Sequence, residues 1–213
     1  MSFDLLAPYY RSMERVLAGS KLQRCRLALL EEIQKPTTVL LMGEGHGRFL
    51  PELMRRHPSA QITCLDASSA MIGAAQISLR REGLDPARVE WLHADAMEWI
   101  PPAQSYDLVV THFFLDCFTA DQLDVLIGRI SSALKPQAEW LFSDFRVPPD
   151  GFTRLRAQII LWLMYRFFRR AAQLSARTLV SPVSRFHSQG FVLRQERIFE
   201  WGLLHAQLWQ RVR

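Results

Sequence analysis

The chain has 213 residues, a length that suits one domain with a single buried core. Its hydrophobic content of 49% and charged content of 22% are globular values, which exclude an intrinsically disordered chain. Three scattered cysteines without a CxxC pair indicate reduced thiols. The sequence shows no signal-peptide pattern and no apolar run of about 18 to 20 residues, so a cytoplasmic protein without a transmembrane segment is expected.

The formal charge is unevenly distributed. Residues 146–213 contain 12 arginines and three acidic residues, a net charge of +9, whereas residues 1–145 carry a net charge of −4. A basic third of this kind can meet nucleic acid, anionic lipid or an acidic substrate, or it can be a solvated arginine face. Composition leaves these alternatives open.

The spacing of apolar residues alternates along the chain between the period of a helix and that of a strand. An N-terminal helical region is expected over 10–34 and is stopped by Pro36. Ser68 and Thr119 are the expected N-caps of two later helices. The further helices are expected at 47–57, 68–83, 119–134, 150–174 and 181–190, and the strands at 37–42, 61–66, 88–95, 106–113, 138–145, 191–200 and 203–212. Helices between strands predict a parallel sheet covered on both faces, and the short final connection predicts an antiparallel pair.

A glycine-rich loop, Gly43-Glu44-Gly45-His46-Gly47, follows the first strand of this sheet. Its glycines allow a sharp turn and a close approach of a ligand to the backbone. A dinucleotide loop would place its third glycine at position 48, where Arg48 stands, and this argues against an NAD(P) oxidoreductase. The loop alone is weak evidence for a particular cofactor.

Carboxylates at the ends of two neighbouring strands strengthen the evidence for a cofactor site. Asp66 ends the second strand and Asp95 follows the third, where ligands bind in open parallel sheets, and Asp107 starts the fourth strand. With the loop, these residues resemble the class I S-adenosylmethionine-dependent methyltransferases over about residues 37–146, and the final strand pair also fits that family. The resemblance implies an α/β fold: a Rossmann-like, seven-stranded, mostly parallel sheet with helices on both faces and the last strand antiparallel.

The same resemblance implies a single methyltransferase domain over 1–213. Its parts would be an N-terminal helical cap (1–36), a cofactor-binding core (37–146), a helical insertion or lid (147–190) and a C-terminal strand pair (191–213).

The implied cofactor is S-adenosyl-L-methionine, and its product S-adenosyl-L-homocysteine. By resemblance, the cofactor would be bound by Gly43, Gly45 and Gly47 at its methionine end, by Asp66 at the ribose, by Ala67, Met71, Asp95 and Ala96 around the adenine, and by His112 near the sulfonium. One position departs from the family. The family often has an acidic residue two positions before the first glycine, where this chain has Leu41, and Glu44 lies inside the loop instead. Glu44 can accept from the cofactor's ammonium or cap the following helix.

The segment THFFLDCF, residues 111–118, supplies candidates for the acceptor side. His112 titrates near neutrality and is the candidate base, and Asp116 is expected to orient it or to contact the substrate. The substrate pocket is expected to include Phe113, Phe114, Phe118, Asp144 and the N-terminal aromatics Tyr9 and Tyr10. The six histidines form no metal-binding pattern, so no metal is expected.

Helix 152–174 has more apolar surface than one packing face explains. The packing face is expected to consist of Ala157, Ile160, Leu161, Met164, Phe167, Phe168 and Ala171. Leu155, Ile159 and Trp162 lie among the arginines of the other half. Three interpretations remain open: a lid over an apolar substrate, a self-association or packing helix, and a membrane-surface helix.

The sequence therefore predicts methyl transfer from S-adenosylmethionine to a small, apolar or lipid-like acceptor. An RNA or protein methyltransferase that binds through the arginine-rich third is the first alternative, and a non-catalytic S-adenosylmethionine-binding protein is the second. The expected partner is a small-molecule substrate, while a peripheral membrane contact and the oligomeric state stay open.

Overall fold

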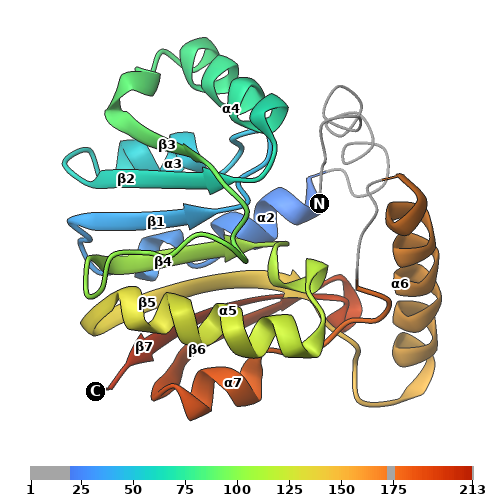
Figure 1. Cartoon of the computed structure of the whole chain (residues 1–213). Helices are drawn as coiled ribbons and strands as arrows, with labels where there is room; N and C mark the ends of the chain where they lie inside the picture. Colours follow the sequence, from blue (N-terminus) through green and yellow to red (C-terminus); the bar gives the residue numbers. More distant parts are fainter. Residues whose placement is uncertain (1–19, 172–175, 213) are drawn as a thin grey trace.

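The computed structural model describes residues 20–171 and 176–212, which form one seven-stranded sheet with helices around it (Figure 1). The predicted strands are all present. Their bounds are β1 (Thr38–Met42), β2 (Gln61–Asp66), β3 (Val89–His93), β4 (Tyr106–His112), β5 (Leu134–Phe145), β6 (Phe191–Phe199) and β7 (Leu204–Arg211).

The strand order is β3-β2-β1-β4-β5-β7-β6. β1 to β5 pair in parallel, and β7 inserts between β5 and β6, antiparallel to both. The predicted Rossmann-like sheet with an antiparallel last strand is therefore confirmed. The order reverses between β1 and β4, so the loop that follows β1 lies at the switch point, where open α/β sheets bind ligands.

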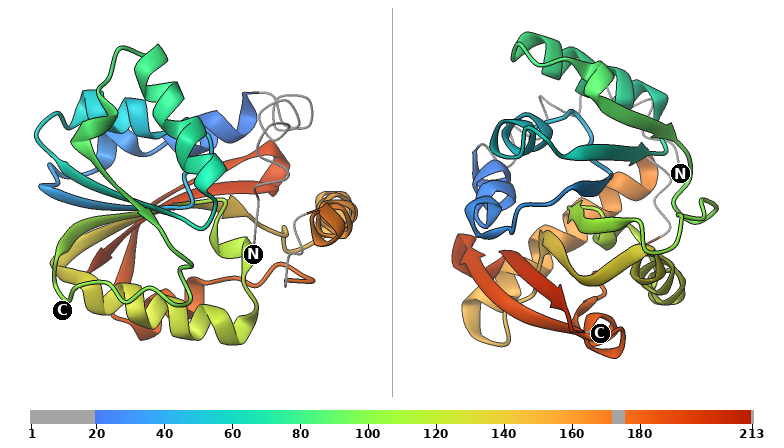
Figure 2. Two further views of the ribbon diagram at one scale, coloured as in Figure 1. Left: turned by 45° about the horizontal axis from the view of Figure 1, so that its top comes forward. Right: turned by 90° about the vertical axis from the view of Figure 1, so that its left-hand side faces the viewer.

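Helices cover both faces of the sheet (Figure 2). Ser68 and Thr119 are N-caps as predicted: the Ser68 hydroxyl accepts from the Met71 N–H, and Thr119 forms a capping box with Gln122. The helices are α2 (Lys21–Leu27), α3 (Leu50–Arg56), α4 (Ser69–Arg81), α5 (Ala120–Ala133), α6 (Gly151–Ala171) and α7 (Val183–Ser188), with 3-10 turns η1 (Leu30–Glu32), η2 (Pro86–Arg88), η3 (Leu115–Cys117) and η4 (Glu200–Gly202).

Successive side chains of the strands point to opposite faces of the sheet and form two cores. In β1, Val39 and Leu41 point into the core shared with α2, α3, α4 and α6, whereas Leu40 and Met42 point into the core shared with α5 and α7. A strand buried on both faces reads as a continuous apolar run, which explains why VLLM directly precedes the glycine loop. Both cores hold the carboxyl ends of the strands in place.

Two predicted helices are shorter than expected. The N-terminal region is not one helix to residue 34, because α2 ends at Leu27 and the chain turns through η1. This turn buries Leu29, Leu30 and Ile33 against the sheet. Residues 10–19 of that prediction lie outside the described chain. α3 begins at Leu50 rather than at 47, because Gly47 has a φ of +67°, which no right-handed helix contains.

The packing face of α6 is displaced from the predicted one. Ala157, Leu161 and Tyr165 recur every four residues and are buried, and Tyr165 was not part of the prediction. Phe167, which was predicted for this face, is 44% exposed. The face is completed by the partly buried Ile160, Met164 and Phe168. The helix stands on the side of the sheet toward which the parallel strands point (Figure 1).

Candidate functional site

The glycine loop between β1 and α3 turns through three left-handed glycines, Gly43, Gly45 and Gly47, with φ of +66°, +63° and +67°. A Cβ at Gly43 would lie 2.3 Å from the Phe114 ring, and one at Gly47 would lie 2.9 Å from Cα of Ala75 in α4. A Cβ at Gly45 would meet no atom of the described residues within 4 Å. Gly43 and Gly47 therefore fit the loop to its neighbours, and Gly45 is the position with open space above its backbone.

Glu44 caps α3. Its Oε1 accepts from the N–H of Phe49 at 2.7 Å and from the N–H of Leu50 at 3.0 Å. These are two of the backbone donors that a helix N-terminus leaves unsatisfied, and a carboxylate there also interacts favourably with the helix dipole. A binding role toward a cofactor ammonium stays a prediction.

We expect Glu44→Ala to lower the free energy of unfolding by about 1 to 2 kcal/mol, because two N-terminal donors of α3 lose a charged acceptor. Urea denaturation followed by circular dichroism measures this loss. Glu44→Gln, which keeps one acceptor oxygen, is the matched control and should lose less. Equal stability of all three proteins would contradict the capping role.

Asp66 joins the glycine loop to the end of β2. Its Oδ1 accepts from the N–H of Ser68 at 2.9 Å and its Oδ2 from the N–H of Gly45 at 3.4 Å. Ala67 and Met71 follow at the start of α4, where the Ala67 carbonyl lies 3.2 Å from Nε2 of His93. The glycine loop after β1 and the predicted cofactor-binding residues after β2 thus form one continuous surface.

Asp95 lies on the loop after β3, next to that surface in the strand order. Its Oδ1 accepts from the N–H of Met97 at 2.8 Å, and its carbonyl accepts from the N–H of Trp99. Ala96 beside it is buried. These bonds hold the Asp95 carboxylate in a tight turn at the carboxyl edge.

His112, the last residue of β4, is 5% exposed and neither ring nitrogen has a hydrogen-bond partner among the described residues. Its ring meets that of Phe49 edge to face at 4.5 Å. Burial and, secondly, the charge of Arg26 hold the pKa of His112 well below its usual range, so the imidazole is neutral. A buried imidazole with two unmet nitrogens points to a missing polar partner at this position.

Asp116 and Asp144 form a buried acid pair beyond His112. The N–H of Asp116 donates to Oδ2 of Asp144 at 3.1 Å. Burial raises the pKa of Asp116 to about 6. Burial and the neighbouring Asp116 charge raise the pKa of Asp144 well above its usual range. Asp116 forms no hydrogen bond with His112, because its carboxylate accepts from the Cys117 thiol, so the first of its two expected roles is not seen and its contact with the substrate stays a prediction.

Two residues of this region were missed from the sequence. The Tyr165 hydroxyl of α6 donates to the Asp116 carbonyl at 3.0 Å, and the buried Arg26 of α2 lies over the Phe113 ring at 5.1 Å. The four-residue spacing from Leu161 could have identified Tyr165. Nothing in the local sequence distinguishes Arg26 from the other basic residues of its helix.

The predicted aromatic residues lie around the Asp116–Asp144 pair. The Phe114 ring contacts Gly43 and meets Phe118 edge to face at 5.1 Å, while Phe113 meets Phe145 at 5.3 Å. Phe113 has a φ of +52°, a strained value that turns the chain sharply out of β4. Tyr9 and Tyr10 lie outside the described residues.

Asp107 lies at the other end of the sheet. Its carboxylate accepts from the N–H groups of Thr37 and Thr38 and pairs with Lys135 at 3.4 Å, so it ties the start of β1 to β4. It is a structural residue of the amino edge and is separate from the site.

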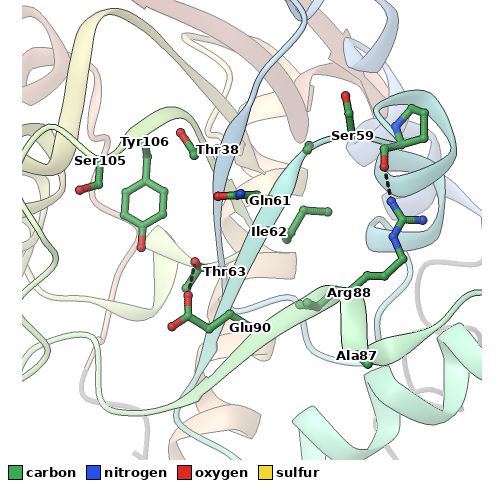
Figure 3. A pocket seen from close by; sticks show the side chains of 13 residues that line it. Thr38, Ser59, Gln61, Ile62, Thr63, Ala87, Arg88, Glu90, Ser105 and Tyr106 are labelled. Carbon is green, nitrogen blue, oxygen red and sulfur yellow. Dashed lines mark hydrogen bonds between the residues drawn. The ribbon is translucent and has the colours of Figure 1, made fainter.

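A groove of about 590 Å³ also lies at the amino edge. Figure 3 shows Thr63 donating to Glu90 and Arg88 donating to the Pro58 carbonyl along it. The lining residues come from the starts of the strands and from the turns that precede them. The groove is therefore distant from the glycine loop, and it contributes nothing to the carboxyl-edge site.

Within residues 20–171 and 176–212, no cluster of histidine, cysteine and acidic side chains could hold a metal ion. The same residues contain no helix that is long and apolar enough to cross a membrane.

Residues 39–137 match the model of a methyltransferase domain family. A malonyl-[acyl-carrier protein] O-methyltransferase from Paenibacillus sp. strain JDR-2 is 32% identical over 113 residues, which are 52% of this chain and 39% of that relative. The chain thus spans less than half the length of this relative.

Two solved structures share the fold. An O-methyltransferase family protein from Burkholderia thailandensis has a TM-score of 0.70 at 19% identity, covering 96% of this chain and 61% of its own. The 1,6-didemethyltoxoflavin-N1-methyltransferase of the same organism, solved with S-adenosylhomocysteine, has a TM-score of 0.69 at 15% identity, covering 99% and 86%. The matched region, the sheet order and the shared fold make this chain similar to the class I S-adenosylmethionine-dependent methyltransferases.

Proposed function

We propose that the chain binds S-adenosylmethionine at the carboxyl edge of its sheet and transfers the methyl group to a small acceptor. The observation that carries this proposal is the contact between the loop after β1 and the end of β2. The N–H of Gly45 meets Oδ2 of Asp66 at 3.4 Å, below the open space over Gly45. Asp66 would hold the ribose, and Asp95 and Ala96 the adenine edge. Gly43, Glu44, Gly45 and Gly47 would surround the methionine end.

S-adenosylmethionine would supply a methyl group already activated by a positive sulfonium. The protein then has to align the acceptor, exclude water and remove a proton. Phe114, with Phe118 packed edge to face against it, supplies an apolar wall beside the loop. Asp116 is suited to receive the proton, because its pKa of about 6 lies close to neutral pH. The neutral imidazole of His112 can accept or donate a hydrogen bond toward the reacting groups.

The acceptor we propose is small and apolar or lipid-like. The aromatic wall and the apolar α6 beside the site support this substrate class, with 147–190 acting as a lid on the core of 37–146. The names of the relatives point to two different acceptors: a malonyl group on an acyl-carrier protein in one case and 1,6-didemethyltoxoflavin in the other. Neither name refers to a nucleic acid.

We expect His112→Ala to keep S-adenosylmethionine affinity within about threefold while methyl transfer slows by about 100-fold. Isothermal titration calorimetry measures the affinity, and transfer of a labelled methyl group to a metabolite extract measures the rate. His57→Ala is the matched control, since His57 is also buried and lies at the end of α3, away from the site. Loss of cofactor affinity in His112→Ala would make His112 a binding residue and remove it from the chemical step.

A further inference from the structure

The outward face of α6 carries an apolar stripe over residues 152–163. Its exposed side chains are Phe152, Leu155, Ile159, Trp162, Leu163 and Phe167, with exposures from 44% to 73%. At 100° per residue the first five fall within one stripe, opposite the buried Ala157 and Leu161. Trp201 of η4, 72% exposed, extends the stripe, and the Arg156 guanidinium lies 5.3 Å from its ring. Contiguous exposed apolar surface of this kind marks an interaction site.

Four arginines of this helix lack acidic partners among the described residues. No acidic residue occurs between Asp150 and Glu196 in the sequence. Arg154, Arg156, Arg166 and Arg169 form no ion pair within the part of the chain that the structure describes, whereas salt bridges elsewhere join Arg55 to Glu52 and Glu82, Arg56 to Glu31, Arg185 to Asp124, and Arg197 to Glu32. The apolar stripe is therefore flanked by uncompensated positive charge.

Two aromatic contacts show how charge and apolar surface are combined. Arg166 lies over the Trp162 ring at 5.6 Å, as Arg156 does over Trp201. Each guanidinium thus lies over an indole ring of this surface, while its aliphatic stem adds apolar area. Tryptophan beside arginine suits the boundary between lipid headgroups and acyl chains. No helix in the described residues can span a bilayer, so such contact would be peripheral.

We propose that α6 and η4 dock on an anionic membrane surface, with the stripe entering the headgroup boundary and the arginines binding lipid phosphates. A second copy of the chain fits poorly, because it would bring arginines against arginines with no carboxylate on the helix. A nucleic acid would use the arginines but leave Leu155, Ile159 and Leu163 unpaired. Docking would set the carboxyl edge at the membrane, because Tyr165 on the opposite side of α6 contacts Asp116. The proposal is independent of catalysis.

Vesicle flotation tests the proposal with the full chain. We expect it to bind vesicles of phosphatidylcholine mixed with phosphatidylglycerol at least tenfold more strongly than pure phosphatidylcholine, and to dissociate as salt rises. Trp162→Asp and the pair Arg166→Glu/Arg169→Glu should each weaken binding about tenfold or more. Ile100→Asp, at a side chain 78% exposed, and Arg80→Glu/Arg81→Glu on α4 are the matched controls and should bind like the original protein.

Three outcomes would overturn the proposal. The original protein could fail to bind mixed vesicles. The arginine pair could abolish binding while Trp162→Asp has no effect, which would show charge attraction without insertion. Sedimentation could reveal a dimer that Trp162→Asp dissociates, which would assign the face to a second copy. Circular dichroism of each variant confirms that the altered proteins are folded.

Discussion

Asp66→Ala is expected to weaken S-adenosylmethionine binding by about 100-fold or more. In the proposed site the Asp66 carboxylate accepts from both ribose hydroxyls, and a hydrogen bond to a charged group contributes about 1.5 to 3 kcal/mol. The variant also loses the bonds from Gly45 and Ser68 that fix the loop at the end of β2. Calorimetric titration with S-adenosylmethionine measures the effect.

The matched control for this variant is Asp107→Ala. Asp107 also accepts several bonds, from Thr37 and Thr38, but at the amino edge of the sheet. We expect Asp107→Ala to have a lower free energy of unfolding than the original protein, but to keep its affinity for S-adenosylmethionine at temperatures at which it remains folded. If both variants lost affinity equally, the effect of Asp66 would be on folding, and the assignment of the carboxyl edge would fail.

The Asp116–Asp144 pair is expected to make stability fall as pH rises. The folded pKa of Asp116, about 6, lies above its ordinary value of 3.8, so the folded protein binds this proton more tightly than the unfolded chain. The associated stability is fully present below pH 3.8 and is lost as pH rises through about 6. This difference between the folded and the ordinary pKa of Asp116 corresponds to at most about 3 kcal/mol in the free energy of unfolding.

Urea unfolding at about pH 5 and pH 8 measures this loss. Asp116→Asn cannot ionise, so its free energy of unfolding should change less between the two pH values than that of the original protein. The methyl-transfer rate of the original protein should rise with pH around the Asp116 pKa and be lost in the variant. A stability difference between the two proteins that does not vary with pH would show that Asp116 keeps an ordinary pKa.

Local patterns predicted most of the fold. The predicted strand 61–66 coincides with β2, and Ser68 and Thr119 are N-caps, because strand periodicity and caps depend on neighbouring residues. The alternation of strands and helices predicted the parallel sheet, and the strand order seen in the structure puts the glycine loop at its switch point.

Long-range contacts could not be predicted in this way. The contact between Tyr165 and Asp116 joins residues 49 positions apart, and the Arg26 guanidinium of α2 reaches Phe113, which follows β4. The two sequence-based roles for Glu44 also needed coordinates, since only the fold shows its carboxylate against the N–H groups of Phe49 and Leu50. Asp107 contributed only to the family resemblance, and as a residue near the start of β4 it lies at the amino edge.

A crystal structure of the chain with S-adenosylhomocysteine tests the central claim most directly. The account predicts density for the ligand at the carboxyl edge, with its backbone contact at Gly45, its ribose at Asp66 and its sulfur near His112. Ligand density in the amino-edge groove beside Thr63 and Glu90, or none in crystals grown at saturating ligand, would contradict it.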